Sequence, residues 1–314
     1  MTTTESSAPA EDLAPDPAES PELRKLAADV RWFTGSPLAG AFGGLALDQV
    51  AYREIAAAVD RTGRFAENFT DRGVRSFAFG ALMAFGDSAD RQAFRAELKK
   101  LHADVKGSGR GEFADTRYSA LSPDLWMWVA VSSIRVVYIA YLNVCGRPLG
   151  DEEKEVVYRT LRTELGHLEL PSRRGKLPAT VAEMEAYYDR IAGTELADNE
   201  FLRFARRNFL APPPSALLIP PALHPIWRPL AKYLARPTIV LSDGTAHPRM
   251  RELLGVRRTT AERLEFVVYL TLLQLAWTRL PRKLTLEPLA YNRYRYERLR
   301  RRYRSVLLDS FAAP

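Results

Sequence analysis

From residue 22 onward, nearly every segment of this chain places its apolar residues at intervals of three and four. That spacing gathers them on one face of a helix, so each segment is predicted to form an amphipathic helix. No run alternates apolar and polar residues clearly enough to predict a strand. We therefore expect an all-α fold, a single large helical domain of about a dozen helices over residues 22–314.

The predicted helices cover residues 23–32, 45–59, 70–85, 87–105, 122–144, 151–165, 180–192, 199–209, 249–254, 260–280 and 289–308. Residues 39–44 (AGAFGG) are small and glycine-rich, which suits close approach by another element or by a flat ligand. Residues 106–120 are rich in glycine and charge and are predicted to be a loop.

Two segments interrupt this helical pattern. Residues 1–21 are acidic and proline-rich with no hydrophobic stretch, and are predicted to be a disordered arm of a cytoplasmic protein. Residues 211–229 (APPPSALLIPPALHPIWRP) contain too many prolines for a regular helix, so we expect an extended segment that crosses between two halves of the fold. A rigid linker packed on the core is favoured over a lid or a membrane-contacting loop.

The most apolar predicted helix, residues 122–144, approaches the length needed to cross a bilayer. Arg135 stands in its middle beside two serines, an arrangement that is unfavourable in lipid. A buried central helix is therefore the favoured interpretation.

Several classes of site are missing from this sequence. The single cysteine, Cys145, excludes an intramolecular disulfide and a multi-cysteine zinc site. No glycine-rich nucleotide loop, HExxH zinc motif or GxSxG nucleophile elbow is present. The formal net charge of +7 is compatible with anionic partners but says nothing about the fold.

His102 is one of only four histidines and lies on the apolar side of the helix predicted over 87–105. A histidine among leucines usually satisfies its ring nitrogens inside a core. Neutral imidazole is also a good axial ligand for haem iron, and haem needs an apolar pocket. On this residue alone, the core histidine is the favoured interpretation.

The helix predicted over 70–85 carries a second group. Arg72, Arg75 and Ser76 share one face, and Phe79 and Met83 continue it. Arginine stays charged when buried and binds carboxylates with two parallel hydrogen bonds, and haem propionates are such carboxylates. Taken alone, surface ion pairs explain these arginines as well.

Residues 292–304 (NRYRYERLRRRYR) interleave arginine with tyrosine. Such a run suits an anionic membrane surface or nucleic acid, and nucleic acid is the less favoured of the two. The simplest interpretation is a solvated terminal helix whose tyrosines pack inward.

Six short motifs, in order, resemble the haem-b oxygenase family that includes latex clearing protein and the mycophenolate-pathway oxygenase MpaB. The resemblance covers most of residues 36–310. The motifs are GGLALDQVAYREIAAAV (Gly43–Val59), RGVRS (Arg72–Ser76), HADVKG (His102–Gly107), YSA followed by DLWMWV (Tyr118–Val129), the stretch from Leu165 to Glu183, and RELLG (Arg251–Gly255).

The resemblance implies an all-α domain that encloses haem b, with His102 as the proximal iron ligand. It places Arg72 and Ser76 on the distal-side helix, contacting a propionate or tuning the iron, with Arg75 among the catalytic residues. Ser76 replaces the family's threonine, and Arg75 replaces a lysine that caps the iron in rubber-cleaving members. Because arginine does not deprotonate, such a capped state is not expected here.

The implied activity is oxidation of a hydrophobic small molecule with O₂ or peroxide, by C=C cleavage, hydroxylation or desaturation. Candidate pocket walls are Phe79, Met83, Trp126, Trp128 and Tyr138. Two rival hypotheses remain: a haem-free helical protein with the same fold, and a basic module that binds a membrane surface or nucleic acid through residues 292–304.

Overall fold

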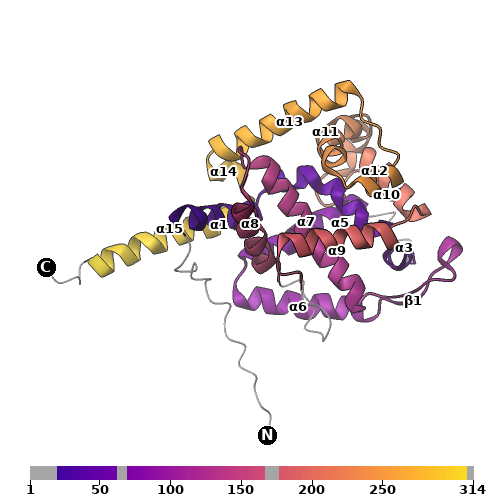
Figure 1. Ribbon diagram of the computed structural model, residues 1–314, viewed down its shortest axis with the longest axis horizontal. Coiled ribbons are helices and arrows are strands. Elements are labelled where there is room, and N and C mark those ends of the chain that lie inside the picture. The colour runs from indigo at the N-terminus through magenta and orange to yellow at the C-terminus, as the bar shows by residue number, and fades with distance from the viewer. Residues whose placement is uncertain (1–19, 62–68, 167–176, 310–314) are drawn as a thin grey trace, which may run out of the picture.

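The computed structural model describes residues 20–61, 69–166 and 177–309, and within them confirms the predicted all-α fold (Figure 1). The first half holds α1 (Pro21–Phe33), the 3₁₀ helix η1 (Pro37–Ala46), α2 (Leu47–Ala51), α3 (Arg53–Asp60), α5 (Phe69–Phe85), α6 (Ser88–Ala103), β1 (Lys106–Ser108), η2 (Gly111–Phe113) and β2 (Arg117–Ser119). There follow α7 (Pro123–Val144), α8 (Asp151–Glu164), α9 (Val181–Thr194), α10 (Glu200–Leu210), η4 (Pro221–Leu223), α11 (His224–Thr245), α12 (Pro248–Leu253), α13 (Thr260–Arg279), α14 (Arg282–Thr285) and α15 (Pro288–Asp309). The predicted arm at residues 1–21 lies almost entirely outside the described residues.

Helix α7 runs through the middle of the molecule and joins its two apolar cores (Figure 1). Its first turns contribute Leu125 and Trp128 to one core, and its later turns contribute Ile134 and Tyr141 to the other. In the described part of the chain it is the one helix long and apolar enough to cross a membrane. Arg135 forms a salt bridge with Glu185 of α9 at 3.1 Å, so its charge is paired inside the fold. The predicted central helix is confirmed.

The glycine-rich stretch predicted to allow close approach forms η1, and the element that approaches it is α11. A Cβ atom on Gly44 would lie 2.4 Å from the Phe209 ring and 2.8 Å from Ser242, so no larger residue fits. The Gly44 amide also donates to Ser242 Oγ at 3.0 Å. Backbone contact at this point therefore depends on glycine.

The single helix predicted over residues 45–59 is instead two helices. Tyr52 is extended, with ψ at 119°, and forms an isolated β-bridge with Leu196. The Ala197 amide donates to the Ala51 carbonyl beside it. A long-range backbone pairing, which the local apolar period does not encode, divides α2 from α3.

Two further predictions were wrong. Residues 224–229 of the expected extended segment belong to α11, which tolerates Pro229 and Pro237 in its interior. The predicted loop at 106–120 contains a short antiparallel hairpin that pairs Lys106 with Ser119. Its strands are too short for an alternating pattern to be visible.

Helix α15 contains the basic run and extends away from the body (Figure 1). Its first half is attached to α1, because Glu297 binds Arg31 and Tyr294 packs edge-on against Trp32, with ring centroids 5.1 Å apart. Tyr296 and Tyr303 are exposed, so only part of the predicted inward packing of its tyrosines is present.

Candidate active site

Helices α5 and α6 form a hairpin that carries the predicted site residues. The connection is short, and Asp87 caps α6 in a reciprocal arrangement with Asp90. Phe79 of α5 contacts Phe94 of α6 edge-on, with ring centroids 6.2 Å apart. Arg72 precedes Phe79 by seven residues and His102 follows Phe94 by eight. Each therefore lies about two helical turns beyond this contact, at the open end of the hairpin.

The ring of His102 is held by two contacts. Its Nδ1 lies 2.7 Å from the carbonyl oxygen of Leu98, one turn earlier in α6. A carbonyl oxygen only accepts, so Nδ1 carries a proton, and in the neutral imidazole the lone pair is then on Nε2. The ring also packs edge-on against Trp126 of α7, 5.3 Å between centroids. Metal-binding histidines are typically held by such a bond from the other ring nitrogen.

The surface beside His102 suits a flat apolar group. Although α6 carries an apolar stripe, none of its described side chains is buried. Leu101, next to His102, is 61% exposed, and Leu98, one turn earlier, is half-buried. Protein atoms therefore cover the apolar side chains at this end of the hairpin only in part. An imidazole with a free lone pair, uncovered apolar side chains and two arginines together fit haem.

Arg72, Arg75 and Ser76 occupy exposed positions on α5, as their spacing predicted. Desolvation by its surroundings lowers the pKa of Arg72, and the neighbouring charge of Arg75 lowers it further. Arginine nevertheless remains protonated at neutral pH. The start of α5 therefore presents positive charge beside an apolar surface, which suits an anionic group such as a propionate.

The first turn of α5 is tied to the proline-rich segment that precedes α11. Thr70 Oγ1 donates to the Pro213 carbonyl at 2.6 Å. Buried Asp71 accepts hydrogen bonds from Ser215 Oγ at 2.5 Å and from the Leu217 amide at 3.4 Å. These bonds, that from Ser215 foremost, lower the pKa of Asp71. The proline-rich segment thereby fixes the helix that carries Arg72.

The five candidate pocket residues separate into two groups. Trp126 contacts His102 directly, and Phe79 and Met83 lie on α5, with Met83 buried. Trp128 is buried between Tyr52 and Tyr188. Tyr138 is buried further along α7 against Tyr158. The structure brings Trp126 to His102 and places Trp128 and Tyr138 inside the two cores.

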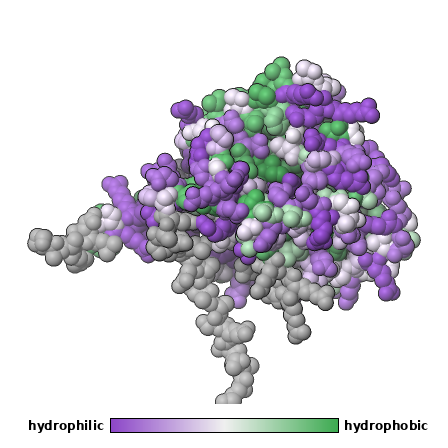
Figure 2. Space-filling model, viewed as in Figure 1, coloured by the Kyte–Doolittle hydropathy of each residue, from purple (hydrophilic) through white to green (hydrophobic). Residues whose placement is uncertain are grey.

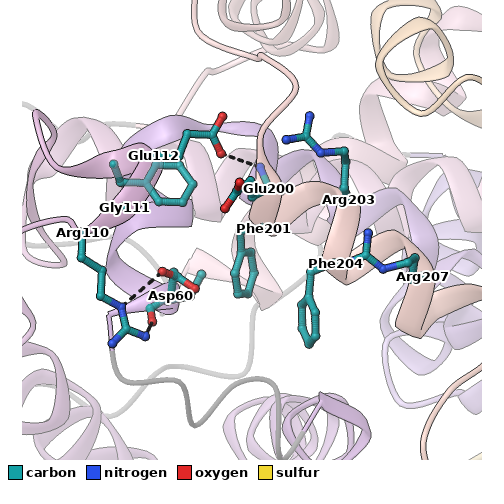
Figure 3. Close-up of a pocket in the computed structure, with 11 residues that line it drawn as sticks. Asp60, Arg110, Gly111, Glu112, Glu200, Phe201, Arg203, Phe204 and Arg207 are labelled. Atoms are coloured by element: carbon teal, nitrogen blue, oxygen red, sulfur yellow. Dashed lines mark hydrogen bonds and ion pairs between the residues drawn. The ribbon is translucent and has the colours of Figure 1, made fainter.

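A cavity of about 580 Å³ lies elsewhere, between α10 and the loop around η2 (Figure 3). Arg203 and Arg207 lie across it from Arg110, which binds Asp60. None of the predicted site residues lines it. Its walls are mixed, because Phe201 and Phe204 line it beside the charged groups, but neither His102 nor Arg72 does. The open end of the α5–α6 hairpin therefore remains the candidate site.

One buried acid was missed by the sequence reasoning. Asp48 of α2 is 2% exposed and accepts a hydrogen bond from Tyr188 at 2.9 Å. Its second carboxylate oxygen has no hydrogen-bond partner among the described residues. The same holds for the indole nitrogen of Trp128, which packs on Tyr188. Burial raises the pKa of Asp48 to about 7. The available signal was an acid inside the apolar run GGLALDQVA.

Comparison with known families gives one match. The model for "ER-bound oxygenase mpaB/B'/Rubber oxygenase, catalytic domain" matches residues 30–275, which include the whole α5–α6 hairpin. Searches of curated proteins and of solved structures returned no match.

Proposed function

The chain belongs to the mpaB and rubber oxygenase catalytic-domain family and is an oxygenase; we propose that it uses haem b to oxidise a hydrophobic small molecule. The observation that supports this proposal best is the state of His102. Its Nδ1 is committed to the Leu98 carbonyl, and its Nε2 lone pair lies at the open end of the hairpin that carries Arg72. Bound haem would supply the activation of O₂ or peroxide.

The protein residues would then hold and orient the reactants. His102 binds the iron, and the Leu98 carbonyl fixes the ring through Nδ1. Arg72 offers a two-pronged donor to a propionate carboxylate. Ser76, one turn further along α5, offers a hydroxyl that both donates and accepts. Arg75 holds its proton, so it supplies charge rather than a lone pair.

The apolar surroundings define the substrate class. Exposed Leu101 lies next to His102, half-buried Trp126 packs on its ring, and half-buried Val74 lies between the two arginines of α5. A charged substrate would lose its hydration on this apolar surface and would find only the arginines of α5 as polar partners. A largely apolar molecule is therefore expected beside the cofactor.

The test is the absorption spectrum of the full chain purified with haem supplied. We expect a Soret band, and a shifted band when the dithionite-reduced protein is exposed to carbon monoxide, because no lysine stands at position 75 to cap the iron. Protein that is folded by circular dichroism but shows no Soret band would support the haem-free alternative instead.

Replacing Arg72 is expected to weaken haem binding without abolishing it. An Arg72→Gln variant loses a charge-assisted bond to a propionate, roughly 1.5–3 kcal/mol, or about a tenfold or greater rise in the haem dissociation constant. Haem titration followed at the Soret band measures it. Arg302→Gln on α15, an exposed arginine far along the chain, is the matched control and should leave the constant unchanged.

A further inference from the structure

Helix α13 presents a continuous apolar stripe to solvent. Its exposed side chains recur at intervals of three and four, which places them on one face of the helix. The stripe consists of Leu264, Val267, Val268, Leu272 and Leu275, each 48–67% exposed. Figure 2 shows hydrophobic side chains along the upper edge of the molecule, where Figure 1 places α13. A soluble surface seldom exposes a patch of this kind without a partner.

Helix α11 carries a second apolar stripe beside the first. Its exposed members, with one from η4, are Leu223, Ile226, Leu230, Tyr233 and Leu234. The two helices pack together, and Arg236 of α11 binds both Glu262 and Glu265 of α13. These bonds hold both acids of α13 against a single cation of α11.

Exposed cations stand at both ends of the α13 stripe and on α11. Arg263 is exposed in the first turn of α13, and Arg279 is exposed in its last. Lys283 of α14 and Lys232 of α11 are exposed as well. Long cationic side chains at both ends of an apolar helix face suit a lipid bilayer with anionic headgroups. The charged groups reach the headgroups while the apolar side chains insert into the acyl layer.

A second copy of this chain fits this pattern less well. Two α13 helices packed face to face would bring cations together whether they ran parallel or antiparallel, because both ends carry an exposed arginine. Such like-charge pairing opposes association. Anionic lipid headgroups offer the complementary charge at both ends.

The apolar surface also continues toward the candidate site. Leu217 and Leu218, in the proline-rich segment, are 52% and 66% exposed. The same segment is bonded to the first turn of α5 through Thr70 and Asp71. Exposed apolar side chains therefore run from α11 to the segment that holds the helix of Arg72.

We propose that η4, α11 and α13 dock on an anionic lipid bilayer and that apolar substrate reaches the site from the bilayer. The second part rests on the proposed function; the docking does not. This surface is separate from α15, whose exposed Leu299 and Tyr303 stand among seven arginines and form the predicted alternative contact.

The test is flotation of the full chain with vesicles of phosphatidylcholine, with and without phosphatidylglycerol. We expect binding that needs the anionic lipid and weakens with salt. A Val268→Glu/Leu272→Glu variant should bind at least about tenfold more weakly than the parent, because two charges would have to enter the apolar layer. An Ala89→Glu/Gln92→Glu variant adds the same charge at exposed positions of α6 and should bind nearly as the parent does.

Other outcomes are equally informative. Unchanged binding by the α13 variant, or binding lost only in Leu299→Glu/Tyr303→Glu of α15, would overturn the proposal. A second contrary outcome has two parts: the parent does not bind vesicles, and in sedimentation experiments it forms a dimer that the α13 substitutions dissociate. The Soret band is recorded on the same samples: vesicle binding without a band rejects the haem function and leaves the docking intact.

Discussion

A His102→Ala variant, purified with haem supplied, is expected to lose the Soret band of the parent chain and its haem-dependent oxidation. Alanine offers no lone pair to iron, and no cluster of three or more His, Cys, Asp or Glu side chains in the described part of the chain provides a substitute. The ring is half-buried and packs edge-on against Trp126 at the edge of the fold. Folding should therefore survive, which a thermal melt by circular dichroism checks.

A cavity variant separates ligation from packing. His102→Gly leaves room for free imidazole, and adding imidazole should restore the Soret band if iron ligation is the role of the ring. His224→Ala, at the start of α11, removes a histidine bonded to the Ile219 carbonyl and should keep the band. An unchanged band in His102→Ala would reject the ligand assignment outright.

The helices around the site could be predicted because their signals are local. The structure places α5 at Phe69–Phe85 and α7 at Pro123–Val144, within a residue of the predicted ends at 70–85 and 122–144. Apolar spacing and the proline in the first turn of α7 set these limits, and the Asp87 cap likewise sets the start of α6. Each depends on residues only a few positions apart.

Helix α11 could not be predicted because its stability comes from distant contacts. Pro229 and Pro237 each remove a backbone donor and crowd the preceding turn, which disfavours an isolated helix by about 3 kcal/mol. The helix nevertheless packs on η1, where Gly44 permits close approach, and on α13. Tertiary burial outweighs local propensity here.

The candidate site was predictable as residue types but not as an arrangement. The pattern identified His102, Arg72 and Ser76 as members of two helices, and the motif resemblance linked them. It did not reveal that Ser215 and Pro213 hold the start of α5, because those contacts span more than 140 residues. The docking of His102 on Trp126 likewise depends on how α6 crosses α7.

The second large effect concerns Asp48 and the pH dependence of stability. Burial raises its pKa from an ordinary 3.8 to about 7, against the hydrogen bond from Tyr188 and the charge of Arg135. Between those values the folded protein holds a proton that the unfolded chain releases. The contribution of Asp48 to the unfolding free energy therefore falls as pH rises from about 4 to about 7, by up to roughly 4 kcal/mol, and is flat above.

An Asp48→Asn variant removes this titration, because the amide is neutral at every pH and its oxygen still accepts from Tyr188. Urea unfolding of both proteins across pH should show the variant gaining on the parent as pH rises, by about 1–4 kcal/mol at pH 8. Tyr188→Phe is a second test: it removes the bond that favours the charged carboxylate and so raises the folded-state pKa of Asp48, and the loss of stability in this variant should continue to a higher pH than in the parent. A difference between parent and Asp48→Asn that does not change with pH would mean that Arg135, 4.0 Å above the Tyr188 ring, already keeps Asp48 ionised in the folded core.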